Sequence, residues 1–155
     1  MLGTVDRVIS SPLRRAVDTA AALGAEPEID ERWIELDYGD LDGAELASVP
    51  RDLWDRWQRD PAFRPPGGES LAAVGRRVRE ACDELVASAV EHEVVVVSHV
   101  SPIKAAVAWA LSVGDQISWR LFLAPGSITR IAVGPRGAVV RSFNEVGHLA
   151  EGLAG

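Results

Sequence analysis

The sequence is poor in the residues from which disulfides, metal clusters and membrane spans are built. It has one cysteine, Cys82, in 155 residues, so an internal disulfide is excluded and a reducing compartment is indicated. Cys82 falls within an apolar helical pattern, which favours a buried packing role over a reactive thiol. No apolar run reaches the length of a membrane span, and no secretory signal is recognised. These absences predict a cytoplasmic protein that does not enter a membrane.

Positive charge is also scarce. The chain carries 23 acidic and 16 basic residues, and its formal net charge is −7. This balance argues against a nucleic-acid partner or a membrane surface. Asp37 and Asp40 lie on a glycine loop, where adjacent acids are poor evidence of metal-ligand geometry, so neither a metal nor another cofactor is expected. The length, with 47% hydrophobic and 25% charged residues, predicts one globular domain spanning residues 1–155.

The most informative segment is the run of four valines, Val94–Val97, which leads directly into Ser98 and His99. An unbroken β-branched run bounded by polar residues predicts a strand buried on both faces of a parallel sheet. A helix is predicted over 102–111. A histidine between such a strand and helix stands where α/β sheets bind ligands, beside free backbone N–H groups. This place suits an anion, and above all a phosphate.

The beginning of the chain repeats this arrangement. A strand is predicted at Val5–Ser10 and a helix over 12–23, with Ser11 as its N-cap. Arg14 and Arg15 then fall in the first helical turn, the unfavourable end for cations in the helix dipole. Their position indicates an anionic guest. The alternative is that both are solvated surface charges, with Arg14 paired to an acid one turn further on.

The remaining pattern alternates between strands and helices. An extended segment is expected at 28–36, helices at 44–58 and 69–90, and a hairpin of strands 128–133 and 138–143. Trp54 and Trp57 are expected to be packing or pocket-lid residues rather than a stacking platform for nucleic-acid bases. The alternation predicts an α/β sandwich with an appended β-hairpin.

Four motifs occur in order along this pattern. They are Ser-x-Leu-x-Arg-Ala at 11–16, Glu-x-x-Tyr-Gly at 35–39, Pro-Gly-Gly-Glu-Ser at 66–70 and Val-Val-Ser-His at 96–99. Together they resemble the histidine phosphatase superfamily, the phosphoglycerate mutase-like proteins, from about Val5 to Leu149. The resemblance implies a three-layer α/β/α sandwich of phosphoglycerate mutase-like type with a mostly parallel sheet. It also implies hydrolysis or transfer of a phosphomonoester through a phosphohistidine, without a metal.

The resemblance assigns roles to individual residues. Arg15 would grip the phosphoryl oxygens, with a planar fork that matches phosphate geometry. Glu35 would be the general acid that protonates the leaving alcohol. His99 would donate hydrogen bonds to the phosphoryl group. Backbone N–H groups near Ser11 and Val100 would complete the phosphate site, although Val100 stands where the family often has glycine, so its Cβ could alter the pocket.

The nucleophile of the family is missing from this sequence. Members carry it as the histidine of an Arg-His-Gly motif after the first strand, whereas the histidines here are His92, His99 and His148. Met1 precedes what resembles the second strand by a few residues, so the first strand, its loop and the first helix are expected to be missing. Two functions remain open. The chain belongs to a phosphomonoester hydrolase (phosphatase or mutase) acting on a phosphorylated small molecule, or it is a non-catalytic remnant that binds phosphorylated ligands or assembles with another chain.

The missing strand also predicts an assembly. In the family it lies between the valine strand and the C-terminal hairpin, so its loss leaves two strand edges unpaired. Either the hairpin shifts to pair with the valine strand, or a second copy of the chain pairs across the gap. Self-association as a homodimer is the favoured outcome.

Overall fold

A small parallel sheet organises the part of the chain that carries the motifs. The computed structural model describes residues 4–24 and 26–149. Strands β1 (Arg7–Ser10), β2 (Glu28–Ile29) and β3 (Val94–Val97) form a three-stranded parallel sheet in the order β2-β1-β3. Val8 and Ile9 point to opposite faces of the central strand, and both are buried. The sheet therefore needs a covering layer on each side.

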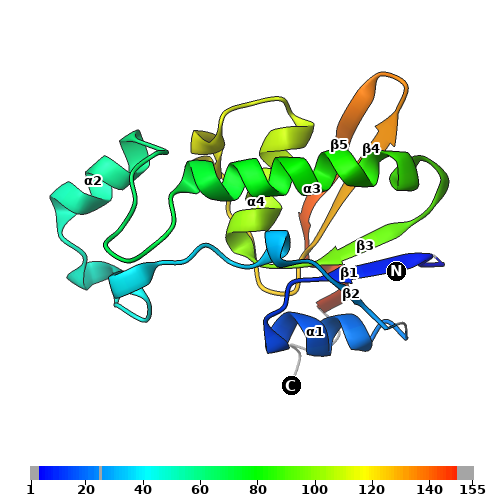
Figure 1. The fold of residues 1–155 in the computed structure, drawn as a ribbon, viewed down its shortest axis with the longest axis horizontal. Helices are drawn as coiled ribbons and strands as arrows, with labels where there is room; N and C mark the ends of the chain where they lie inside the picture. Colours follow the sequence, from blue (N-terminus) through cyan, green and yellow to red (C-terminus); the bar gives the residue numbers. More distant parts are fainter. Residues whose placement is uncertain (1–3, 25, 150–155) are drawn as a thin grey trace.

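Helices supply these two layers, which confirms the predicted three-layer α/β architecture. Helix α1 (Arg14–Ala21) contacts β1 and β3 on one side of the sheet (Figure 1). Helices α3 (Leu71–Glu91) and α4 (Val100–Ala110) pack against each other on the other side. Helix α2 (Arg51–Arg59) lies at the end of the molecule farthest from the sheet (Figure 1).

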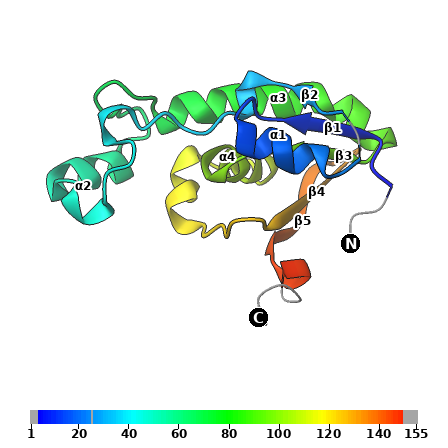
Figure 2. The same ribbon diagram turned by 90° about the horizontal axis from the view of Figure 1, so that it is seen from below.

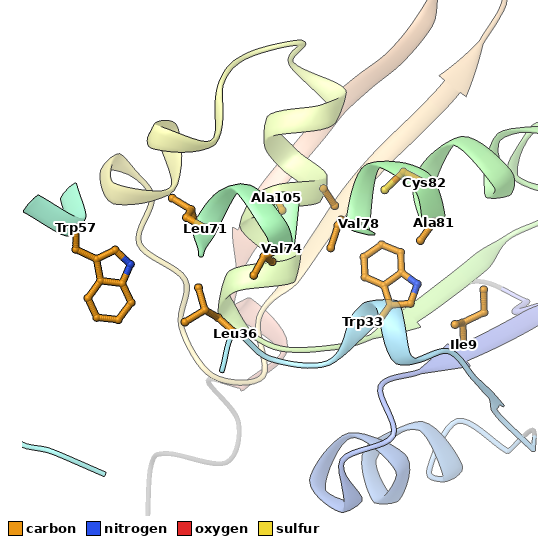
Figure 3. Close-up of a cluster of buried hydrophobic side chains, with 11 residues drawn as sticks. Ile9, Trp33, Leu36, Trp57, Leu71, Val74, Val78, Ala81, Cys82 and Ala105 are labelled. Carbon is orange, nitrogen blue, oxygen red and sulfur yellow. The ribbon is translucent and has the colours of Figure 1, made fainter. Parts of the chain in front are cut away.

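The core lies between the sheet and α3. Trp33 sits between Ile9 of β1 and the apolar face of α3 (Figure 3). Val74, Val78 and the other helix residues in this cluster recur at three- and four-residue spacing, as an amphipathic helix requires. Cys82 belongs to the same cluster, and burial raises the pKa of its thiol to about 12, so it is a packing residue as predicted.

The C-terminal hairpin forms a sheet of its own. Strands β4 (Ile128–Gly134) and β5 (Gly137–Glu145) are antiparallel, contact α3 and α4, and project away from the three-stranded sheet (Figure 2). Within residues 4–24 and 26–149, β3 is hydrogen-bonded to β1 alone. The prediction that β3 is buried on both faces is wrong, because all four valines remain partly exposed on a strand at the edge of its sheet.

Two predicted helices begin later than expected. Helix α1 starts at Arg14 with Leu13 as its N-cap, so Ser11 is not the capping residue. The helix predicted over 44–58 is divided into a 3₁₀ turn at Leu46–Ser48 and α2. Pro50 explains the division, since proline lacks the N–H and disfavours helical backbone in the residue before it. None of the helices in the described ranges is long and apolar enough to cross a membrane.

Candidate active site

Ser11 and His99 form the centre of the site at the carboxyl edge of the sheet. Because Ser10 pairs with Val97, β1 and β3 end at the same level. The Ser11 Oγ and His99 Nε2 atoms lie 2.7 Å apart, and the two residues are 0% and 9% exposed. His99 is also the N-cap residue of α4, so the first backbone N–H groups of that helix lie next to this residue.

Arg15 supplies the positive charge at this edge. It is exposed on the first turn of α1, and its guanidinium forms no hydrogen bond or ion pair with any residue in the described ranges. Its neighbour Arg14 instead lies 3.5 Å from Asp18, with both side chains in solvent. Both arginines are exposed, but only Arg14 is paired within the described residues, so the role of Arg15 in phosphate binding stays a prediction.

The surroundings of His99 favour its neutral form. Burial is the main cause that lowers the pKa of His99, and the positive charges of Arg15 and Arg77 lower it further. The carboxylate of Glu35 acts in the opposite direction. These interactions show that Arg15, Glu35 and His99 occupy one electrostatic neighbourhood, although they come from three separate segments of the chain.

Glu35 is fixed at the start of α4. Its Oε1 atom accepts hydrogen bonds from the backbone N–H groups of Leu36, at 2.7 Å, and of Ser101, at 3.1 Å. The carboxylate is half-buried, so it lies at the boundary between the helix N-terminus and solvent. A carboxylate in this position is held against the positive end of the helix dipole. Val100, immediately before Ser101, is 39% exposed at the rim of the site.

Two glycine motifs lock together behind Glu35. The Asp40 N–H donates to the Pro66 carbonyl at 2.9 Å, and the Glu69 N–H donates to the Asp37 carbonyl at 2.8 Å. Gly39 has a φ of +56°, and a Cβ there would stand 2.2 Å from the Pro66 carbonyl oxygen. Both the backbone conformation and the contact therefore require glycine, which explains why Tyr-Gly and Pro-Gly-Gly occur together in this chain.

Arg77 is a site residue that sequence reasoning missed. From α3 it forms an ion pair with Glu69, whose Oε2 lies 2.9 Å away, and it donates to the backbone carbonyls of Arg32 and Glu35. It thus ties the Glu35 segment to the Pro-Gly-Gly-Glu-Ser loop. An arginine inside a long helical pattern gives no sign of this role, because its partners lie 42 and 45 residues away.

A cavity of about 340 Å³ adjoins the site on the side of Glu35. Trp54 and Trp119 contribute aromatic walls, with their ring centroids 5.4 Å apart in an edge-to-face arrangement. Trp57 is a buried core residue that also borders the cavity, so the prediction of packing or pocket residues is confirmed for both Trp54 and Trp57. Burial and the charge of Glu35 raise the pKa of Tyr38, another lining residue.

The acidic loop and the remaining histidines lie outside the centre of the site. Asp37 Oδ1 accepts from the Gly39 N–H at 2.8 Å, which is a local turn contact. His92 is exposed before β3, and the ring of His148 lies 2.9 Å from the Gly126 carbonyl. Within residues 4–24 and 26–149, no group of three or more His, Cys, Asp or Glu side chains is arranged to hold a metal ion.

Sequence comparison assigns this arrangement to a family. The profile of the histidine phosphatase superfamily (branch 1) matches residues 3–146. The chain belongs to this superfamily. Phosphoserine phosphatase 1 of Hydrogenobacter thermophilus is 33% identical over 95% of this chain and 74% of its own length. A bifunctional protein of Mycobacterium tuberculosis is 39% identical over 95% of the chain but only 43% of its own length. The chain therefore spans less than half of that relative.

Solved structures support the same fold. A mycobacterial glucosyl-3-phosphoglycerate phosphatase in complex with VO3 superposes with a TM-score of 0.80 at 30% identity, over 92% of this chain and 77% of that one. A phosphoserine phosphatase variant of Entamoeba histolytica, in complex with phosphoserine, gives a TM-score of 0.84 at 24% identity, over 93% and 76% of the two chains. This member of the histidine phosphatase superfamily thus shares its three-layer architecture with solved phosphatases.

Proposed function

We propose that this chain forms the phosphate clamp and the leaving-group side of a phosphomonoester hydrolase. The observation that carries the proposal is the convergence of Ser11, Arg15 and His99 at one sheet edge, with Glu35 at the adjacent helix start. Arg15 offers a planar fork to two phosphoryl oxygens, and His99 offers a ring N–H to a third. Glu35 would protonate the oxygen of the departing alcohol. The backbone N–H groups near Ser11 and Val100 add neutral donors.

The nucleophilic step needs a group that this sequence does not contain. The chain has no Arg-His-Gly motif, and the His99 Nε2 atom is occupied by the Ser11 hydroxyl. Without a nucleophile, the phosphate clamp and the general acid provide only the residual rate acceleration that comes from substrate binding and electrostatic stabilisation. The proposed hydrolysis therefore requires a nucleophilic histidine that this sequence does not supply, and would run through a phosphohistidine as in the family.

The substrate is proposed to be a phosphorylated small molecule. Relatives of this chain are called phosphoserine phosphatase and glucosyl-3-phosphoglycerate phosphatase. Both names describe small phosphorylated compounds, in agreement with a cavity of modest volume beside the clamp. A cytoplasmic location and assembly into a homodimer complete the proposal.

A second candidate is a non-catalytic phosphate-binding or assembly module. The missing Arg-His-Gly motif is the observation that favours it. Both candidates predict that the clamp binds phosphate, but only the first predicts hydrolysis when a nucleophile is supplied. Turnover therefore separates the two functions, whereas phosphate affinity tests the clamp that they share.

Calorimetric titration with inorganic phosphate tests the clamp. Arg15→Ala removes a charge-assisted contact worth about 2 kcal/mol, so we expect roughly 30-fold weaker binding. Arg14→Ala is the matched control, because it removes the same charge from the same helical turn but from a side chain that faces solvent. Equal phosphate affinity in the Arg15 and Arg14 variants would contradict the clamp.

A further inference from the structure

The chain contains a single lysine, Lys104; its other basic residues are all arginines. It is the only charged residue of α4 (Val100–Ala110), whose other residues are mainly apolar. Most of the residues around it on this helix are buried, among them Ala105, Ala106 and Val107. A charged side chain in such a helix calls for a physical reason, because alternatives of similar length would pack at lower cost.

Lys104 lines the 340 Å³ cavity, together with Tyr38, Trp54 and Trp119. It is half-buried, and its ammonium group has no hydrogen bond or ion pair with any residue of the described ranges. Burial lowers the pKa of Lys104, and the carboxylate of Glu35 partly offsets that effect. The cavity thus holds a partly desolvated cation that the protein itself does not neutralise.

Its position along α4 relates Lys104 to the catalytic groups. His99 caps the helix, Ser101 donates its N–H to Glu35, and Lys104 follows Ser101 by three residues. Residues three apart lie on the same face of a helix. Lys104 therefore lies on the side of α4 that carries Ser101, whose N–H binds the Glu35 carboxylate, about one turn beyond the helix start that His99 caps.

A substrate that extends from the start of α4 into the cavity, which Val100, Ser101 and Lys104 line, would meet His99, Glu35 and Lys104 in this order. Its phosphoryl group would lie at Arg15 and His99, its bridging oxygen at Glu35 and the remainder of its alcohol in the cavity beside Lys104. Asp42 also lines the cavity, but it is exposed, so solvent and salt screen its charge more than that of Lys104. The cavity is accordingly suited to a leaving group that carries negative charge.

We propose that Lys104 is a specificity-determining residue that binds a carboxylate on the leaving alcohol, so that the site prefers phosphorylated hydroxy acids to neutral phosphomonoesters. The inference rests on the proposed function, since it assumes that the phosphoryl group lies at Arg15 and His99. The indole rings of Trp54 and Trp119 line the same cavity and reduce the exposure of the pair to solvent, which strengthens it. An ammonium group also suits a single carboxylate as a compact point charge, whereas an arginine fork favours phosphate.

A matched pair of ligands tests the proposal on the 155-residue chain. 3-Phosphoglycerate and glycerol 3-phosphate have the same carbon skeleton and phosphate, but only the first carries a carboxylate. By calorimetry we expect 3-phosphoglycerate to bind about tenfold more tightly, as one partly exposed charge pair allows. Lys104→Met should abolish this preference and leave the affinity for glycerol 3-phosphate within about twofold. Lys104→Arg, which keeps the charge, should retain most of the preference.

Arg120→Met is the control for net charge. It removes one positive charge beside Trp119, but Arg120 is exposed and does not line the cavity. The preference for 3-phosphoglycerate should survive in this variant. A general effect of charge on anion binding would instead reduce the preference equally in the Arg120 and Lys104 variants, and would overturn the assignment.

The lone lysine also gives a direct readout that needs no substitution. Acetylation of Lys104 by acetic anhydride, followed by mass spectrometry, should be slowed by 3-phosphoglycerate and unaffected by inorganic phosphate. Equal binding of the two ligands, or equal protection by phosphate, would overturn the role of Lys104 alone. Failure of inorganic phosphate to bind, with no effect of Arg15→Ala, would overturn the proposed function and this inference together.

Discussion

The Ser11 hydroxyl and the His99 imidazole, 88 residues apart in the chain, meet at 2.7 Å above the sheet. The in-register pairing of β1 with β3 brings them together, because each residue follows its strand within two positions. The contact fixes one ring nitrogen, while burial and Arg15 lower the pKa of the imidazole. Near neutral pH the site therefore presents a neutral, oriented His99, whose protonation would be favoured by any anion placed beside it.

Sulfate should raise the pKa of His99. A bound dianion offsets the charge of Arg15 and favours the imidazolium, and by linkage sulfate should bind more tightly as the pH falls from about 7.5 towards the lowered pKa. Sulfate is chosen over phosphate because its own charge does not change in this range. An NMR titration of the ring protons measures the shift, with the exposed His92 as an internal reference. A pKa of His99 that does not move at saturating sulfate would contradict an anion site here.

Gly39→Ala should destabilise the fold more than Gly43→Ala. Both glycines have a positive φ, +56° and +72°, so each alanine incurs backbone strain of about 1–3 kcal/mol. Only at Gly39 would the new Cβ also collide with the backbone of Pro66 and Gly68; nothing lies within 4 Å of it at Gly43. The difference between the two free energies of unfolding, measured by urea denaturation, isolates this loop contact. Equal destabilisation by the two substitutions would show that the Gly39 loop and the loop at residues 66–68 can move apart without a loss of stability.

Sequence patterning accounts for much of this structure where the signal is local. The limits of β3 are those of the valine run, because β-branched residues between polar ones leave no other local choice. Short motifs predict Arg15, Glu35 and His99 as site residues, and the parallel pairing of β1 with β3 explains why the segments of Arg15 and His99 begin at the same edge of the sheet. The prediction of Ser11 as the helix cap is wrong because α1 begins later, at Arg14; the Ser11 hydroxyl accepts from the Leu13 N–H at 3.3 Å and also contacts His99, a tertiary contact that no local pattern shows.

Features that depend on distant contacts could not be predicted. Arg77 connects three segments through side-chain and carbonyl contacts that no sequence spacing encodes. The cavity beside Lys104 exists because Tyr38, Trp54 and Trp119 converge from three parts of the chain. The exposure of β3 likewise depends on which strand is its neighbour, a property of the whole sheet rather than of the valines themselves.

The 155-residue chain should hydrolyse p-nitrophenyl phosphate barely or not at all. The reason is the missing Arg-His-Gly nucleophile, since in the proposed site His99 lies beside the phosphoryl group rather than in line with the leaving oxygen. A fusion that supplies a strand, loop and helix with Arg-His-Gly from a family member should restore turnover, and Glu35→Gln should then reduce it. Robust turnover by the chain alone, lost in His99→Ala and accompanied by phosphorylated His99, would refute this expectation.

Self-association should occur through the free edge of β3. In the described part of the chain no strand pairs with that edge, and the hairpin of β4 and β5 remains a separate sheet instead of closing the gap. Unpaired backbone groups on a flat apolar strand recruit another strand, with about 1–3 kcal/mol at stake for each group that is buried without a partner. Light scattering at tens of micromolar should therefore report a dimer or a larger species.

A charge on β3 should disperse this assembly. Val94 and Val96 pack against the core, so Val95 is the position on the opposite face where a lysine opposes edge pairing with least damage to the core. His92→Lys is the control, because it adds the same charge at an exposed residue just before the strand. Val95→Lys should yield monomers and His92→Lys should not. If the unsubstituted chain is a monomer that unfolds cooperatively, the prediction is wrong. The three-stranded sheet would then be stable in a monomer with one edge of β3 unpaired.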